Sequence, residues 1–333
     1  MSQSPWGPPP ARTGQGNIVR ALVLGLALSL ALGVFAFGLT SYLTSDEPAA
    51  APAPAASEPA PASPSATEPT PQPTPEPQPS DGYDPPPLPQ PTTWDEAEQW
   101  LKANAFYDQE AAVARCAIPR IADPTPPALA VMDEHLNHTM DCLLMVWADP
   151  MQAAGFVLPQ PPVRSYDQPI TTACGTSPSM DQAAAFYCPG DQRVFYAIDR
   201  NRPLFYRTSL EIDNTLAHEF GHTLQGRTGI ISAEWVFEST AKTEELALEY
   251  SRRIELQADC WGGMAMNALS EASGVTADER QLLRQDTYSR GDREGYPRTH
   301  GTPDSGLRWV TVGLESRNAG MCNTFVASSE DVA

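Results

Sequence analysis

Two histidines with a glutamate between them are the residues whose spacing points most directly to chemistry. His218 and His222 lie four residues apart in the segment TLAHEFGHTL, so a helix places both imidazoles on one face, where they can bind one ion. Glu219 projects from the adjacent position, where its carboxylate can accept a proton from water activated by the metal. We therefore expect a zinc site with Glu219 as general base, on a helix over about residues 209–225.

A catalytic zinc site offers three protein ligands and keeps one position open for water, so the two histidines need a partner. In the pattern HExxHxxGxxH the partner is a third histidine, but the positions for its glycine and histidine hold Gln225 and Thr228. We expect a following helix, over about residues 239–268, to supply Glu255 as the third ligand. The alternative is that Glu255 lies on a solvated helix face. Asp259 shares its helix face and can accept the free N–H of a ligating imidazole.

Two residues of the segment HGTPD add alternatives to this site. Asp304 is the rival third ligand, because a shorter fragment of the segment resembles the pattern in which an aspartate completes a zinc site. His300 can stabilise the oxyanion of a tetrahedral intermediate, and we count it as a candidate catalytic residue. The alternative for His300 is a loop histidine that only orders the turn.

The six cysteines are even in number and all lie from Cys116 onward. Beyond a membrane span they would meet an oxidising compartment, which favours disulfides over thiols. Neighbouring positions favour the pairs Cys116–Cys142, Cys174–Cys188 and Cys260–Cys322. A zinc site made of cysteines is the alternative, but the chain contains no CxxC motif.

The remaining pattern predicts a mostly helical domain. Thr93 and Glu96 have the spacing of a capping box, and apolar residues recur at helical spacing from about 128 to 147. His135 and His138 lie on this second helix, where acidic neighbours suggest a solvated face. Residues 159–178 look like a loop, residues 193–198 like a strand, and residues 276–287 like a helix.

The N-terminal part of the chain has a different composition. The run from Ala21 to Ser45 has no charged residue and is long enough to cross a bilayer, which takes about 20 apolar residues. Arginines precede it, which orients the N-terminus to the cytoplasm. A cleaved signal peptide is the alternative, but its apolar core would be shorter, roughly 7–15 residues. Residues 46–92 then hold 17 of the 35 prolines and read as an extended linker.

We therefore expect four regions and one cellular location. The regions are a cytoplasmic N-terminus (1–17), a transmembrane helix (18–43), a Pro/Ala-rich disordered linker (44–92) and a catalytic domain (93–333). The protein would be a single-pass membrane protein with its C-terminal domain outside the cytoplasm. The net charge of −20, without a basic block, excludes nucleic-acid binding through a basic footprint.

Several motifs in order resemble the bacterial neutral zinc metallopeptidase family. They cover about residues 170–325 and comprise TACG (172–175), YCP (187–189), HEFGH (218–222), ELQADC (255–260), HGTP (300–303) with Trp309, and CNTF (322–325). The chain departs from the family after HGT, where it reads PDSGL in place of a charged stretch ending in arginine.

The resemblance implies an α+β, mostly helical zincin-like fold and one zinc ion per domain. His218, His222 and Glu255 would be its ligands and Glu219 the base. The expected function is zinc-dependent hydrolysis of peptide bonds in peptide or protein substrates by a membrane-anchored metallopeptidase. The alternative is a zinc-binding cell-envelope module without turnover. An intact Glu219 argues against that alternative, because a structural metal site needs no base.

Overall fold

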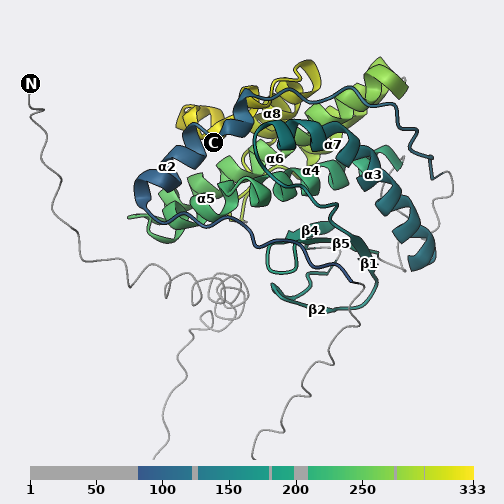
Figure 1. Ribbon diagram of the computed structural model, residues 1–333, viewed down its shortest axis with the longest axis horizontal. Coiled ribbons are helices and arrows are strands. Elements are labelled where there is room, and N and C mark those ends of the chain that lie inside the picture. Colours follow the sequence, from purple (N-terminus) through teal and green to yellow (C-terminus); the bar gives the residue numbers. More distant parts are fainter. Residues whose placement is uncertain (1–81, 122–126, 180–181, 199–208, 274–275, 296) are drawn as a thin grey trace, which may run out of the picture. The chain divides into compact units, whose positions relative to one another are not determined.

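The computed structural model describes residues 82–121, 127–179, 182–198, 209–273, 276–295 and 297–333 (Figure 1). The chain divides into two units, Met1–Asp81 and Gly82–Ala333, and all the described residues belong to the second. The expected transmembrane helix at 18–43, the residues before it and most of the expected linker lie outside the described residues. Within the described ranges, no helix combines the length and the apolar character that crossing a bilayer requires.

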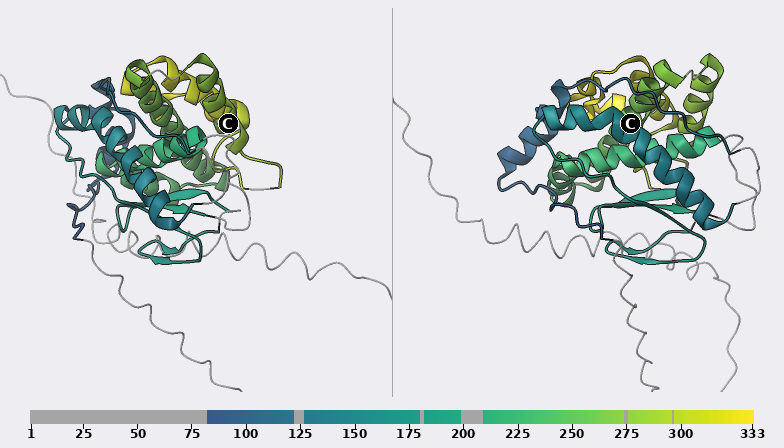
Figure 2. Two further views of the ribbon diagram at one scale, coloured as in Figure 1. Left: turned by 90° about the vertical axis from the view of Figure 1, so that its right-hand side faces the viewer. Right: turned by 45° about the vertical axis from the view of Figure 1, so that its right-hand side comes forward.

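The second unit is a mostly helical α+β domain. Its α-helices are α2 (Trp94–Lys102), α3 (Leu129–Ala153), α4 (Ser209–Arg227), α5 (Ile230–Ser239), α6 (Glu244–Ser273), α7 (Ala277–Arg290) and α8 (Pro303–Glu315). Four short 3-10 helices are η1 (Ala105–Asp108), η2 (Ala319–Cys322), η3 (Thr324–Val326) and η4 (Ser329–Val332). Figures 1 and 2 show the helices gathered on one side of this unit and the strands on the other.

Helix α4 lies at the centre of the domain, and almost every one of its side chains is buried. Helix α6 crosses α4 closely because glycines lie at the contact. A Cβ atom on Gly262 would approach the backbone nitrogen of His218 to 3.0 Å. On another face of α6, Gly313 of α8 meets the backbone at Cys260 and leaves no room for a side chain. Helices α4 and α8 therefore both pack directly against the backbone of α6.

A small sheet covers the other side of α4. It has the order β1-β5-β4, formed by β1 (Val163–Tyr166), β5 (Arg193–Ala197) and β4 (Ala185–Cys188). The central strand β5 runs parallel to β1 and antiparallel to β4. Strands β2 (Thr171–Thr172) and β3 (Gly175–Thr176) form a separate antiparallel pair.

The expectation of a loop over residues 159–178 was wrong, since β1, β2 and β3 all lie there. Their short length and polar residues give no alternating pattern. Side chains of α3 complete the outer edge of β1: Asp133 Oδ1 accepts from Ser165 N at 2.6 Å and Asn137 Oδ1 from Val163 N at 3.1 Å. Such long-range hydrogen bonds stabilise a strand that local propensity does not predict.

Most of the helix predictions agree with the structure, with three differences. The helix expected from residue 239 begins at Glu244, and a separate helix α5 precedes it. Helix α8 was not predicted, although proline fits the first helical position after the Thr302 cap. Thr93 does cap α2, but the carboxylate of Glu96 binds the backbone N–H of Thr92 and leaves the capping box incomplete.

Three disulfides are present, and they are the three pairs expected from the sequence. The Cα–Cα distances are 5.4 Å for Cys116–Cys142, 5.8 Å for Cys174–Cys188 and 5.6 Å for Cys260–Cys322. The third pair joins α6 to η2, so it fixes the C-terminal segment against the helix that carries Glu255.

Residues that precede the expected domain start at residue 93 already pack against the helices. The carbonyl oxygen of Pro86 accepts a hydrogen bond from Arg227 at 2.7 Å, and Gln90 Nε2 donates to Ser232 Oγ at 2.9 Å. Residues 86–90 therefore contact the end of α4 and the start of α5.

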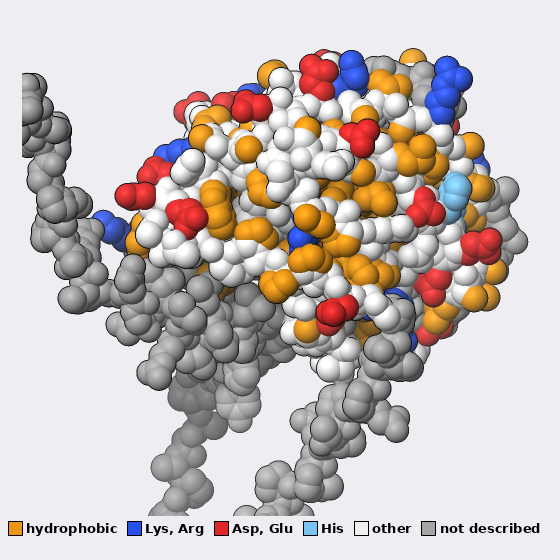
Figure 3. Space-filling model, in the orientation of Figure 1, with side chains coloured by type: hydrophobic (Ala, Val, Ile, Leu, Met, Phe, Trp, Pro, Cys, Tyr) orange, Lys and Arg blue, Asp and Glu red, His pale blue; other side chains and the backbone are white. Residues whose placement is uncertain are grey.

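On the face shown in Figure 3, hydrophobic side chains gather across the middle, and acidic side chains outnumber basic ones at the periphery.

Candidate metal centre

Three side chains from two helices meet in one group of potential metal ligands. His218 and His222 of α4 and Glu255 of α6 each bring one ligand atom, and these atoms all lie within 4.8 Å of one another. The two Nε2 atoms are 3.1 Å apart, and Glu255 Oε2 lies 3.2 Å from His218 Nε2 and 3.3 Å from His222 Nε2. The structure thus brings together the three residues that the sequence nominated.

The tautomer of His218 follows from its partner on the far side of the ring. His218 Nδ1 lies 2.9 Å from Asp259 Oδ1. An ionised carboxylate can only accept, so Nδ1 carries the hydrogen of the neutral ring, and Nε2 is the nitrogen left to bind a cation. Arg290 Nη2 of α7 donates to the same Asp259 oxygen at 3.3 Å and stabilises its charge.

The tautomer of His222 is set by Gln225, which the sequence analysis treated only as a departure from a motif. His222 Nδ1 lies 2.8 Å from Gln225 Oε1, while Gln225 Nε2 donates to the backbone oxygen of Ile254 at 2.7 Å. Because a backbone carbonyl only accepts, the amide nitrogen must face Ile254, and the amide oxygen must face the imidazole. His222 Nε2 is therefore also left to bind a cation. The three-residue spacing of His222 and Gln225 on one helix was the available signal.

Two imidazole Nε2 atoms 3.1 Å apart, beside a carboxylate, form an arrangement that attracts a cation, whether a proton or a metal ion. Burial opposes protonation of His218, but the charges of Asp259 and Glu255 outweigh it and raise the pKa of this imidazole to about 10. Burial would raise the pKa of Glu255, yet the neighbouring His222 and His300 hold it well below its ordinary range. Two imidazole nitrogens and one carboxylate oxygen, with the charges of Glu255 and Asp259 beside them, are the donor set typical of catalytic zinc.

Glu219 lies beside this group on α4, with 6% of its surface exposed. Burial lowers the pKa of His222, and the charges of Glu255 and Glu219 are among the causes that raise it overall. On the sheet side, burial raises the pKa of Tyr166 to about 12, and Glu219 adds to that shift. The carboxylate of Glu219 is therefore close enough to act electrostatically on both the ligand group and the end of β1.

His300 lies at the exposed rim of the group. Its Nε2 is 3.7 Å from Glu255 Oε2, and 57% of the side chain is exposed. Asp292 holds the turn in place, because its two carboxylate oxygens accept from His300 N at 3.0 Å and from Gly301 N at 2.8 Å. Gly301 has φ +84°, a left-handed conformation that favours glycine. Asp292 was not predicted as part of the site, because it has no motif of its own in the sequence.

Asp304, the rival third ligand, is absent from the ligand group. It is exposed in the first turn of α8, where an acidic side chain interacts favourably with the helix dipole.

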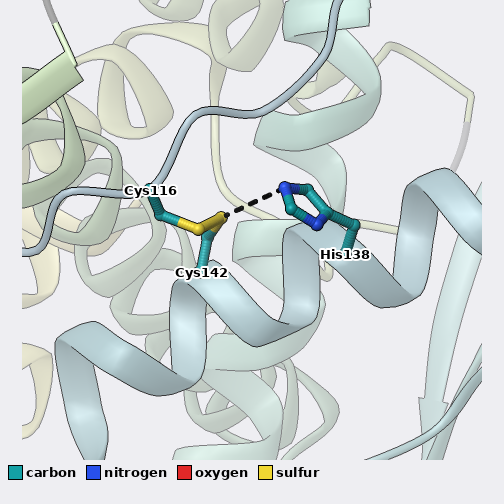
Figure 4. Close-up of side chains that lie close together, drawn as sticks. All are labelled: Cys116, His138 and Cys142. Atoms are coloured by element: carbon teal, nitrogen blue, oxygen red, sulfur yellow. Dashed lines mark hydrogen bonds between the residues drawn. A yellow bond between two sulfur atoms is a disulfide. The ribbon is translucent and has the colours of Figure 1, made fainter.

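A second set of potential ligands is formed by Cys116, His138 and Cys142 (Figure 4). The two cysteines form a disulfide and lack the thiolates that bind metal. His138 Nε2 lies 4.0 Å from Cys142 Sγ and 2.9 Å from the backbone oxygen of Ala117. This set is a disulfide with a histidine beside it.

The assignment of His135 to a solvated face was wrong. His135 is buried, and its Nε2 lies 2.9 Å from Oδ1 of Asp213, a fully buried residue of α4. Thr139 Oγ1 donates to the same oxygen at 3.2 Å. The acidic neighbours of His135 in the sequence face elsewhere, and the partner that explains it comes from another helix.

The chain belongs to the family described as "Putative neutral zinc metallopeptidase", whose pattern matches residues 130–325. An uncharacterized protein of Mycobacterium tuberculosis (strain H37Rv) is 25% identical over 198 residues, which cover 51% of this chain and 64% of the relative. The uncharacterized protein YpfJ of Escherichia coli (strain K12) is 26% identical over 197 residues, covering 54% of this chain and 66% of that protein. The chain thus matches slightly less than two thirds of each relative. No solved structure matches it.

Proposed function

We propose that this protein is a zinc-dependent peptidase whose metal is held by His218 Nε2, His222 Nε2 and Glu255 Oε2. The observation that carries the proposal is that the Nε2 atoms of the two histidines lie 3.1 Å apart. Each ring is oriented by an acceptor that binds its Nδ1 atom on the opposite side. Membership of the zinc metallopeptidase family supports the identity of the metal and the class of substrate. When bound, zinc supplies the Lewis acidity that polarises a peptide carbonyl and acidifies water.

Glu219 is the group on this chain that moves protons. Its carboxylate takes a proton from the attacking water and returns one to the amine nitrogen as the C–N bond breaks. His300 lies on the exposed side of the ligand group, so its ring can donate a hydrogen bond to the developing oxyanion. Asp292 positions that ring through the two backbone N–H groups it binds.

Strand β4, rather than β5, is the strand that can align a substrate backbone. Strand β5 is the central strand and is bonded on both sides, so it has no free edge that could pair with a substrate. Ala197 N donates to Ala184 O at 2.8 Å, and with the antiparallel register this turns the backbone groups of Ala185 and Tyr187 away from β5. Helix α4 lies beside this strand, since a Cβ on Gly226 would meet Tyr187 Oη at 2.9 Å.

The N-terminal segment completes the proposal. The uncharged run from Ala21 to Ser45 would anchor the chain in the membrane, with the catalytic domain outside the cytoplasm. The three disulfides support an oxidising compartment for residues 82–333.

Metal content and digestion of a peptide library test the function together. We expect about one zinc per chain, turnover that a chelator abolishes, and a Glu219→Gln variant that keeps zinc and the fold but loses turnover. Glu244→Gln, an exposed position of α6, is the matched control and should behave as wild type. A Glu219→Gln variant as active as wild type would exclude Glu219 as base. Zinc binding without turnover in the wild type would favour the zinc-binding module instead.

A further inference from the structure

The hydrogen bond that fixes His222 continues far beyond Gln225. Gln225 Nε2 also donates to Gln257 Oε1 at 3.1 Å. Gln257 Nε2 donates in turn to Tyr107 Oη at 3.0 Å and to the backbone oxygen of Cys322 at 3.2 Å. Tyr107 Oη donates to the backbone oxygen of Leu101 at 2.9 Å. The chain of side chains therefore runs from α4 through α6 to η1, and it ends at the last turn of α2.

Each link of this chain can point in only one direction. Backbone carbonyls accept and never donate, so Ile254 O, Cys322 O and Leu101 O orient Gln225, Gln257 and the Tyr107 hydroxyl respectively. With these three carbonyls in place, every donor in the chain faces away from the metal group and every acceptor faces toward it. The acceptor at the near end is Gln225 Oε1, which meets His222 Nδ1.

Reversing one link would break its neighbours as well. If the Gln225 amide turned over, its oxygen would face both Ile254 O and Gln257 Oε1, two acceptors. Gln225 and Gln257 are fully buried and Tyr107 is 8% exposed, so water cannot readily replace the lost partners. A buried network in which each group is satisfied in one arrangement favours that arrangement strongly.

We propose that Gln225, Gln257 and Tyr107 are positioning residues that hold His222 with its hydrogen on Nδ1 and Nε2 directed at the metal. These hydrogen bonds are present in the metal-free protein, so they fix the tautomer and the orientation of the His222 imidazole before the ion binds. The proposal rests on the proposed metal site, but it does not depend on turnover.

The direct test is the tautomer of His222 in the metal-free protein, measured from the ¹⁵N shifts of its imidazole at an alkaline pH where the ring is neutral. The wild type should show a hydrogen on Nδ1 and an unprotonated Nε2. Gln225→Leu should give a mixture of tautomers, and Gln257→Leu a smaller admixture, since Ile254 O still orients Gln225. Gln225→Glu, whose carboxylate can accept from Nδ1 at this pH, should restore the tautomer. It provides a second variant in case the leucine variant does not fold.

The contribution of Tyr107, the last side chain in this series of hydrogen bonds, can be tested with a matched control. Tyr107→Phe and Trp261→Phe each remove one buried donor to a backbone carbonyl, since Trp261 Nε1 donates to Ala319 O at 3.1 Å. Their rings are neighbours, with centroids 6.2 Å apart, but Trp261 has no part in the chain. Tyr107→Phe should increase the hydrogen exchange of His222 Nδ1–H, whereas Trp261→Phe should leave it unchanged.

Zinc affinity, measured by competition with a chelator, gives the second readout. Gln225→Leu should weaken zinc binding roughly 10–100-fold, as loss of a group that orients a ligand does. Gln257→Leu should fall between this variant and wild type. A single Nδ1–H tautomer in both leucine variants, or equal exchange in Tyr107→Phe and Trp261→Phe, would overturn the proposal. A protein that takes up no zinc while the tautomer responds as expected would instead refute the metal site. That result would still support the role of the hydrogen-bonded side chains in fixing the tautomer.

Discussion

A Cβ atom on Gly221 of α4 would lie 2.9 Å from the Cα of Ala258 in α6. Gly221 is the glycine inside HEFGH, between the two histidines, and Ala258 lies three residues after Glu255. The absence of a side chain at Gly221 lets the two helices approach until Glu255 Oε2 reaches both imidazoles. The spacing of the three proposed metal ligands thus depends on a residue that carries no functional group.

Gly221→Ala should therefore disturb both the fold and the metal group. The added methyl group meets helix backbone, which cannot move aside cheaply, so we expect a loss of about 1–3 kcal/mol in the free energy of unfolding. Zinc affinity should fall as well, because Glu255 is pushed away from the histidines. The control is Gly306→Ala in α8, where the nearest atom would be 3.5 Å away. That change should be neutral or stabilising by about 0.5–1 kcal/mol in denaturant unfolding.

The third ligand can be identified by three single variants and a zinc titration. Glu255→Ala should lose most of the zinc affinity, because it removes a ligand and its charge. Asp259→Ala should lose roughly 10–100-fold, since Asp259 only orients His218. Asp304→Ala should bind zinc as wild type does, because Asp304 is exposed and outside the group. Zinc lost in Asp304→Ala but kept in Glu255→Ala would assign the site to an aspartate ligand.

Glu234 should make the stability of the metal-free domain depend on pH. Burial, together with the charges of Glu238 and Glu255, raises the pKa of Glu234 well above its ordinary value, and its Oε1 is enclosed without a hydrogen-bond partner. A raised folded-state pKa favours folding while the group is protonated, and this contribution is lost as the pH rises through that value. Glu234→Gln should thus raise the melting temperature at pH 8 and change it little at pH 4. Equal shifts at both pH values would contradict this reading.

The disulfides should contribute to stability according to the length of chain they close. Cys260–Cys322 closes 62 residues and Cys174–Cys188 closes 14. Loop entropy gives about 4 kcal/mol for the first and about 3 kcal/mol for the second. Replacing both cysteines of a pair by serine and measuring unfolding in denaturant should give the larger loss for Cys260–Cys322. The reverse order would mean that local packing outweighs loop entropy.

The proposed anchor predicts how the full-length protein responds to protease. Added to intact spheroplasts, the protease should cut within residues 46–92 and release the folded domain. Exchange of Arg12 and Arg20 for glutamine should weaken the preference for this orientation, because basic residues before the span set it. A mature N-terminus near residue 45 would show cleavage of a signal peptide instead.

The meeting of His218, His222 and Glu255 was largely predictable, because the functional residues on each helix come in helical spacing. His218 and His222, and likewise Glu255 and Asp259, are four residues apart, so a helix alone places each pair. Local spacing cannot show what lies across the contact between two helices. The role of Gln225 depends on Ile254 O and Gln257, and the burial of His135 depends on Asp213.

The strands were harder to predict for a similar reason. Residues 193–198 are β-branched or aromatic in part and were predicted, but β1 owes its place to Asp133 and Asn137 of α3. Which strand forms an edge depends on the order of all three, and no single segment contains that information. Helix α8 illustrates the opposite case, because Thr302 followed by Pro303 is a local signal for the start of a helix.

The division of the ligands between two helices has a consequence for the order of events during synthesis. His218 and His222 emerge together on α4, but Glu255 follows only after α5 and the first turns of α6. A nascent chain that stops at α5 therefore presents two imidazoles and no completing carboxylate. If the proposed site binds zinc, tight capture of the ion waits until α6 has been made and has docked, so metal loading would be a late step that marks a finished domain.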